Sequence, residues 1–217
     1  MLTTERIPTR RDLERSDVGT LQAGGRTKAD LRLVDLGQGP LVVKDFRHKP
    51  AWVRGIGRLQ IARECKAYRW LGSLPGLPRF AGRVDAHALA IERIAGEPLG
   101  WSSRRQDDGA ALLSRLQEIV ESLHDAGLVH LDLSGRDNVL LTDDGRVFVL
   151  DLASAVWFRP GGWAHRLFFG WFRKPDRAGL LKWKRVLGAG EYTEEERSFL
   201  RRYGFWRSLW IFNRKRR

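Results

Sequence analysis

The chain has 217 residues, of which 42% are hydrophobic and 30% are charged, a composition typical of a globular protein. Its formal net charge of +13 favours an anionic partner, and its single cysteine, Cys65, excludes a framework of internal disulfides and suits a reducing compartment. The N-terminal residues lack the apolar core of a signal peptide, and no apolar run is long enough to predict a membrane-spanning helix, so we expect a cytoplasmic protein.

The N-terminal half contains two pairs of predicted strands with one helix between the pairs. The first twenty residues are polar with balanced charge and are expected to form a loose lead-in. A helix is predicted at residues 52–71, directly after Pro50. The strands are predicted at residues 31–36, 41–46, 80–84 and 88–94.

The clearest helix is predicted at residues 109–126, where six aliphatic side chains fall on one face at helical spacing and Gly127 follows. Two short strands come next, at residues 139–141 and 147–150. The turn at residues 143–145, Asp-Asp-Gly, joins them into a predicted hairpin.

Near the C-terminus, Thr193 and Glu196 form a capping-box pattern that predicts the start of a last helix, with Gly204 as its expected end. Strands therefore dominate the first part of the chain and helices the second. This order predicts an α+β architecture in a single domain, with a sheet-rich first lobe at residues 1–95 and a helical second lobe at 96–217.

The charge is concentrated in residues 157–217, which carry 16 Lys or Arg against 5 Asp or Glu and hold 6 of the 9 tryptophans. Basic charge mixed with tryptophan favours an anionic membrane surface, although aromatic side chains that fill a small core explain the same pattern. Residues 205–217 are the predicted surface anchor, with residues 163–174 as the alternative. No stacking-platform motif is present, so no nucleic acid is expected.

Three polar side chains follow short apolar runs in the middle of the chain. Asp132 comes after Leu128-Val129, Asn138 begins one predicted strand, and Asp151 ends the next. The hairpin would bring Asn138 and Asp151 to the same end, facing Asp132. Carboxylate and amide oxygens suit Mg²⁺, which also keeps waters and substrate phosphates as ligands, and a carboxylate left off the metal can orient an attacking hydroxyl.

These residues resemble the active site of the protein-kinase-like fold over about residues 20–155. His130-x-Asp132-Leu133, followed by Asn138 and by Asp151, is similar to the catalytic loop and metal-binding aspartate of that family. The resemblance implies that Asp132 is catalytic, that Asn138 and Asp151 bind Mg²⁺, and that the phosphate donor is ATP.

The first lobe contains similar positions in the same order. Lys44 resembles the strand lysine that binds phosphates, and Glu64 lies where the family's helix glutamate pairs with it. Gly24-Gly25 lies where the glycine-rich loop covers the phosphates. Residues 90–94 resemble the segment whose backbone meets adenine, here at Glu92 and Ile94.

The sequence also departs from the family pattern. One extra residue separates Asp132 from Asn138, so that strict counting selects Asp137 as the metal ligand, although the Asn-Val-Leu-Leu motif favours Asn138. Leu131 replaces the arginine that reads a phosphorylated activation loop. Asp-Leu-Ala at residues 151–153 replaces Asp-Phe-Gly, and the short remainder implies a reduced helical second lobe.

Three functions remain open from the sequence. Residues 176–184 resemble the C-terminal part of bacterial lipopolysaccharide core kinases, which phosphorylate heptose or Kdo on a lipid-linked sugar at the cytoplasmic face of the inner membrane. Asp132-Leu133-Ser134 resembles instead the catalytic loop of RIO-type protein Ser/Thr kinases, which implies a protein acceptor. The altered Asp-Leu-Ala and the longer loop suggest a non-catalytic kinase-like binding module.

Overall fold

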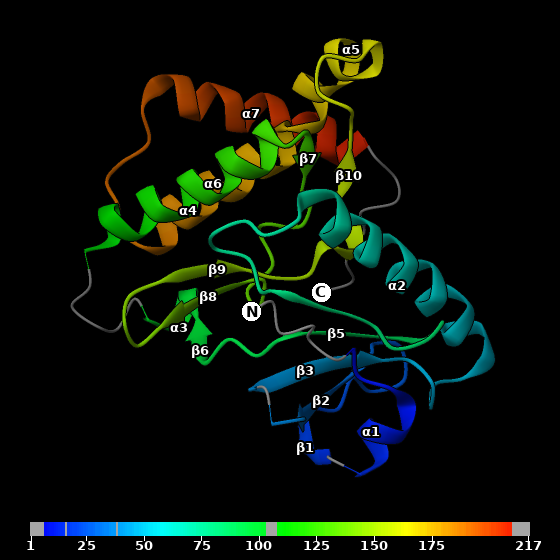
Figure 1. Ribbon diagram of the computed structural model, residues 1–217. Helices are drawn as coiled ribbons and strands as arrows, with labels where there is room; N and C mark the ends of the chain where they lie inside the picture. Colours follow the sequence, from blue (N-terminus) through cyan, green and yellow to red (C-terminus); the bar gives the residue numbers. More distant parts are fainter. Residues whose placement is uncertain (1–6, 16, 38, 103–107, 210–217) are drawn as a thin grey trace.

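The computed structural model describes residues 7–15, 17–37, 39–102 and 108–209, and its architecture is α+β (Figure 1). A sheet-rich N-terminal region is followed by a largely helical C-terminal part, as the sequence predicts. The N-terminal region comprises α1 (Arg10–Arg15), β1 (Asp17–Gln22), β2 (Asp30–Asp35), β3 (Pro40–Asp45), α2 (Ala51–Leu71), β4 (Phe80–Arg83) and β5 (Ala88–Glu92).

The described residues of the C-terminal part form four helices of ten residues or more, together with short strands and turns. Its elements are β6 (Gly96–Pro98), α3 (Leu99–Ser102), α4 (Gly109–Asp125), β7 (Leu128–Val129), β8 (Val139–Thr142), β9 (Val147–Val149), the 3₁₀ turn η1 (Leu152–Ser154), β10 (Val156–Trp157), α5 (Trp163–Phe172), α6 (Lys174–Val186) and α7 (Glu194–Leu209).

The five-stranded antiparallel sheet has the order β1-β2-β3-β5-β4. Helix α2 packs beside it because Val53, Ile61 and Cys65 repeat at helical spacing and are almost fully buried. They share a core with Phe46 and Leu89. The sheet and the buried face of α2 therefore fix which side chains of β3 and α2 meet.

The C-terminal core forms around α4, whose leucines and isoleucine lie on the buried face that the sequence predicts. The Asp108 carboxylate caps this helix by accepting from the Ala110 and Ala111 amides at 2.9 and 3.3 Å. Helix α6 packs against α4 and buries Trp183 in the same core. Figure 1 shows α4, α6 and α7 gathered on the side of the molecule opposite the five-stranded sheet.

The predicted strands are confirmed, as are the helices predicted at residues 52–71 and 109–126. The predicted ends of these elements agree with the structure within two residues. The capping box is also confirmed, because the Thr193 amide donates to Glu196 Oε2 at 2.8 Å and the Glu196 amide donates to Thr193 Oγ1 at 3.2 Å. Gly204 as the end of that helix is wrong, since α7 continues to Leu209. A glycine inside a helix costs only about 1 kcal/mol relative to alanine, which the rest of the helix tolerates.

The loose lead-in is also wrong from residue 10 onward. Residues 10–15 form α1 and residues 17–22 form the edge strand β1. Leu13 is fully buried, and Arg10 forms ion pairs with both Asp45 and Asp85. These partners are distant in sequence, so local composition gave no sign of them.

Within the described part of the chain, no helix is long and apolar enough to cross a membrane. Of the predicted anchor at residues 205–217, residues 210–217 and the side chains of residues 205–209 lie outside the described structure.

Candidate functional site

Lys44 connects three elements that are distant in sequence. From β3, its Nζ donates to Glu64 Oε2 of α2 at 2.9 Å and to Asp151 Oδ1 at 2.8 Å. Glu64 reaches this position because it lies on the buried face of α2, with its side chain only 2% exposed. Three residues predicted for the site, 20 and 107 positions apart, therefore meet at one ammonium group.

In this cluster, the charge of each group changes the pKa of its partners. Burial alone would lower the pKa of Lys44, but the Glu64 and Asp151 carboxylates raise it, so the ammonium remains charged. Burial raises the pKa of Glu64, and the Lys44 charge opposes this rise. Burial also tends to raise the pKa of Asp151, yet the Lys44 charge and hydrogen bond lower it overall. Asp151, with its side chain 45% exposed, is therefore an ionised carboxylate that solvent can reach.

Asp132 and Asn138 are in direct contact. The Asn138 Nδ2 donates to the Asp132 carbonyl at 2.7 Å and to Asp132 Oδ2 at 3.1 Å. Two consecutive turns bring the chain back, with the Gly135 amide donating to the Asp132 carbonyl and the Asn138 amide donating to the Gly135 carbonyl. A Cβ at Gly135 would overlap the Asn138 side-chain amide, so a larger residue there would displace this amide from its contact with Asp132. Asp137, which strict counting selected, is exposed, and this placement favours Asn138.

The hairpin places Asn138 and Asp151 at one end, as the sequence predicts. Val139 pairs with Val149, and the Leu150 amide donates to the Asn138 carbonyl at 2.8 Å. The fully buried His130 ring links the same hairpin to the Asp132 loop. Its Nδ1 accepts from the Asp132 amide at 3.2 Å, so its Nε2 carries the proton and donates to the Leu150 carbonyl at 2.9 Å.

One residue of the site was not predicted from the sequence. Asp176 of α6 is completely buried and accepts from the His130 and Leu131 amides, both at 2.8 Å. His124 Nε2 lies 3.1 Å from the same carboxylate. Leu131 has a left-handed backbone with φ of 66°, which is unfavourable for a leucine and is held in place by these contacts.

Helix α6 holds the Asp132 loop at two further points. Trp183 Nε1 donates to the Leu133 carbonyl at 2.9 Å, and Lys182 donates to the Ser134 carbonyl. Gly179 lets α6 approach, since a Cβ there would lie 3.1 Å from the Leu133 Cβ. Residues 176–184, which carried the second resemblance, thus support the loop that carries Asp132. Carboxylates are common in the first turn of a helix, so the position of Asp176 alone does not mark it as a site residue. Only the resemblance carried by residues 176–184 could have indicated it.

Gly24 and Gly25 lie in the loop between β1 and β2, at the end of the sheet near Asp45. A Cβ at Gly24 would overlap the Ala29 carbonyl, and Gly25 has φ of 59°, so both positions require glycine. Lys49 ties this loop to the β3–α2 connection by donating to the Gly25 carbonyl at 2.8 Å and to Asp30 Oδ1 at 2.6 Å. Among the residues that the structure describes, no hydrogen bond joins either glycine to the Lys44 cluster.

The segment predicted to contact adenine leaves β5 at Glu92. The Glu92 amide donates to the Arg79 carbonyl at 2.8 Å, and the Arg93 amide donates to the Pro40 carbonyl at 3.1 Å. No described residue forms a hydrogen bond with the Ile94 amide, which leaves it for a ligand.

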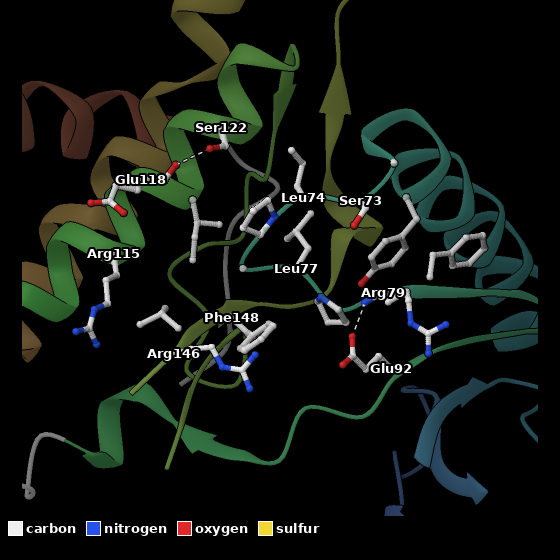
Figure 2. Close-up of a pocket in the computed structure, with 18 of the residues that line it drawn as sticks. Ser73, Leu74, Leu77, Arg79, Glu92, Arg115, Glu118, Ser122, Arg146 and Phe148 are labelled. Carbon is white, nitrogen blue, oxygen red and sulfur yellow. Dashed lines mark hydrogen bonds between the residues drawn. The ribbon is translucent and has the colours of Figure 1, made fainter. Parts of the chain in front are cut away.

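Two open depressions lie beside this segment. One, of about 1220 Å³, is bordered by Arg115, Glu118 and Ser122 of α4 and by Arg79 and Glu92 across from them (Figure 2). The other, of about 380 Å³, includes both Glu92 and Ile94. Neither contains the charged cluster or its neighbours, namely Lys44, Glu64, Asp132, Asn138 and Asp151.

The donor set fits a magnesium ion of the kind that the sequence predicts. Asn138 Oδ1 has no hydrogen-bond partner among the described residues, and Asp151 offers an ionised, accessible carboxylate. The same part of the chain contains no group of three His, Cys, Asp or Glu side chains arranged to hold a metal. Two protein ligands are sufficient for Mg²⁺ when waters and substrate phosphates supply the others.

No protein family and no curated protein sequence matches this chain at a significant level.

Proposed function

We propose that this chain is an ATP-dependent phosphotransferase with a protein-kinase-like fold. The observation that carries the proposal is the Lys44 ammonium, which lies within 2.9 Å of both Glu64 and Asp151. A buried lysine placed by a helix glutamate is suited to bind phosphates of a nucleotide. Asp132 and Asn138 are in contact next to the same end of the hairpin. This contact supports the part of the site that would hold the metal and the acceptor hydroxyl.

In this proposal, Lys44 binds the α- and β-phosphates and Glu64 orients it, while the Glu92 and Ile94 backbone meets adenine and Gly24-Gly25 covers the phosphates. Asp132 orients the acceptor hydroxyl and takes its proton late in the transfer. Asn138 Oδ1 and Asp151 would hold Mg²⁺, which when bound neutralises phosphate charge. The remaining residues position this set, since His130 and Asp176 fix the backbone on both sides of Leu131.

We further propose that the acceptor is a sugar of the lipopolysaccharide core, heptose or Kdo, carried on a lipid. Support comes from residues 176–184, whose resemblance to that kinase group falls on the segment that contacts the Asp132 loop. A RIO-like protein Ser/Thr kinase is the alternative, and it rests on Asp132-Leu133-Ser134.

Nucleotide binding is tested by titrating the protein with Mg·ATP in a calorimeter. Asp151→Asn is expected to weaken binding at least about tenfold, because it removes the charge on a ligand of the metal. Lys44→Ala is expected to do the same, with its fold checked by thermal melting because Glu64 loses its partner. Asp137→Asn and Lys66→Ala alter exposed residues of the same types and serve as controls. Wild-type affinity in both Asp151→Asn and Lys44→Ala would refute the assignment.

Phosphoryl transfer is tested with labelled ATP and three separate acceptors: lipopolysaccharide precursor, a generic protein substrate and water. Asp132→Asn is expected to keep nucleotide affinity and to lose about 10²–10⁴-fold in transfer rate. Transfer to the lipid-linked sugar alone supports the lipopolysaccharide reading, and transfer to protein alone supports the RIO-like one. Nucleotide binding without transfer to any acceptor favours a binding module.

A further inference from the structure

Helix α5 exposes several large apolar side chains for its length. Its ten residues, Trp163–Phe172, include four large apolar side chains that face solvent. Their exposed fractions are 73% for Trp163, 68% for Leu167, 46% for Phe168 and 47% for Trp171. The sequence left open whether the aromatic residues of this segment fill a core, and for Trp163, Phe168 and Trp171 the structure excludes that role.

The four side chains form one continuous face. At 100° per residue, they fall within an arc of about 140° around the helix axis. Phe169 lies on the opposite side, is 6% exposed, and packs against Phe158, His124 and His165 with ring centroids 4.3 to 5.8 Å apart. Phe169 thus fixes the orientation of α5 on the protein, and the exposed face follows from that orientation.

The segment of the chain that carries this face is exclusively basic in charge. The segment 152–175 contains no Asp or Glu, and its charged residues are Arg159, Arg166, Arg173 and Lys174. Arg166, Arg173 and Lys174 are exposed. In Figure 1, α5 projects beyond α6 and α7 at the end of the molecule farthest from the five-stranded sheet. A flat surface could therefore approach it without meeting the sheet.

We propose that α5 lies in the interface of an anionic lipid bilayer, with Trp163, Leu167, Phe168 and Trp171 inserted at headgroup depth. Tryptophan favours that zone because its ring is buried while its N–H stays hydrated. Each basic side chain near an anionic leaflet adds roughly 1 kcal/mol to the free energy of binding. The basic residues of this segment therefore favour anionic lipid over a neutral partner. The proposal concerns the placement of the protein and does not depend on its phosphotransferase activity.

The test is co-sedimentation of the full chain with vesicles of phosphatidylglycerol and phosphatidylcholine, compared with vesicles of phosphatidylcholine alone. Trp163→Ala/Leu167→Ala/Trp171→Ala is expected to lower the partition coefficient onto anionic vesicles at least about tenfold. Because all three side chains are exposed, thermal melting should remain unchanged. Raising the salt concentration should weaken wild-type binding, since the basic contribution is screened.

Helix α2 supplies a matched control. Trp52, Ile56 and Leu59 lie on one face at similar spacing and are 62%, 51% and 68% exposed. Trp52→Ala/Ile56→Ala/Leu59→Ala is expected to bind anionic vesicles as the wild type does. Equal loss in both triple variants would overturn the proposal, because exposed apolar area in general would then drive binding.

Other occupants of this face give different results. If the wild type binds no anionic vesicles, or binds neutral ones equally well, the lipid proposal fails. If α5 instead mediates contact with a second copy, the α5 variant abolishes a dimer seen by light scattering and leaves vesicle binding unchanged. A chain without residues 210–217 should retain binding, and loss of binding in that chain, with wild-type binding in the α5 variant, would assign the anchor to the C-terminus.

Discussion

Replacing Asp176 by alanine is expected to destabilise the protein by about 2–5 kcal/mol. The carboxylate is completely buried and accepts from the His130 and Leu131 amides at 2.8 Å each. A buried donor that loses its acceptor costs about 1–3 kcal/mol, and the His130 amide is fully buried whereas the Leu131 amide is partly so. The left-handed backbone of Leu131 also loses the contact that holds it.

Asp176→Asn should cost less, about 1–3 kcal/mol, because one oxygen still accepts while the amide nitrogen faces an N–H group. Both variants can be compared by urea unfolding followed through tryptophan fluorescence. For a chain of this length, a loss of 2–5 kcal/mol corresponds to a fall in Tm of about 4–20 °C. Hydrogen exchange of the His130 and Leu131 amides should become faster in both variants.

Asp137→Ala is the control, since this exposed aspartate lies in the loop that Asp176 supports and should change stability by no more than about 0.5 kcal/mol. If Asp176→Ala is as stable as Asp137→Ala, the two backbone contacts do not stabilise the loop. The role of α6 as the support of Asp132 would then be refuted.

Other substitutions have equally specific expectations. Lys49→Ala should weaken Mg·ATP binding about tenfold in calorimetry without lowering the transfer rate at saturation, because it frees the loop that contains Gly24 and Gly25. Arg10→Ala should lower the free energy of unfolding by about 2–3 kcal/mol, because it leaves two carboxylates without their cation. Burial raises the pKa of Asp85, but the hydrogen bonds from Arg10 and the His87 amide, together with the Arg10 charge, lower the pKa overall. The stabilisation from this carboxylate is therefore present at neutral pH and is lost as the pH falls below ~4. Acid titration of unfolding should show a smaller decrease in Arg10→Ala than in the wild type.

Most of the fold could be predicted from local patterns, and the exceptions share a physical cause. Helix α4 and the strands of the sheet carry periodic apolar residues, which sequence reading detects directly. Helix α1 has no such pattern and depends on Leu13 and on Arg10, whose partners lie 35 and 75 positions away. Contacts of that separation are set by the packed structure and leave no local periodicity.

The site residues also divide into those that the sequence indicates and those that depend on distant contacts. The sequence indicated Lys44, Glu64 and Asp151 through their resemblance to a known arrangement, and the structure brings these three together. The sequence left Asn138 and Asp137 as alternatives, because counting residues does not reveal the two turns through Gly135 that return the chain to Asp132. The support from α6 was not predicted, since Asp176 satisfies backbone donors 45 and 46 positions away.

The two contacts of Lys44 differ in a way that bears on nucleotide binding. Glu64 is 2% exposed and would be left as an unpaired buried carboxylate if Lys44 moved away, which is strongly unfavourable. Asp151 is 45% exposed, so water can replace Lys44 at its carboxylate with little loss of free energy. We therefore infer that the Lys44–Asp151 pair opens more easily than the Lys44–Glu64 pair, which persists. Asp151→Asn should then leave stability nearly unchanged, whereas Glu64→Gln should lower the free energy of unfolding, and equal losses in the two variants would contradict this order.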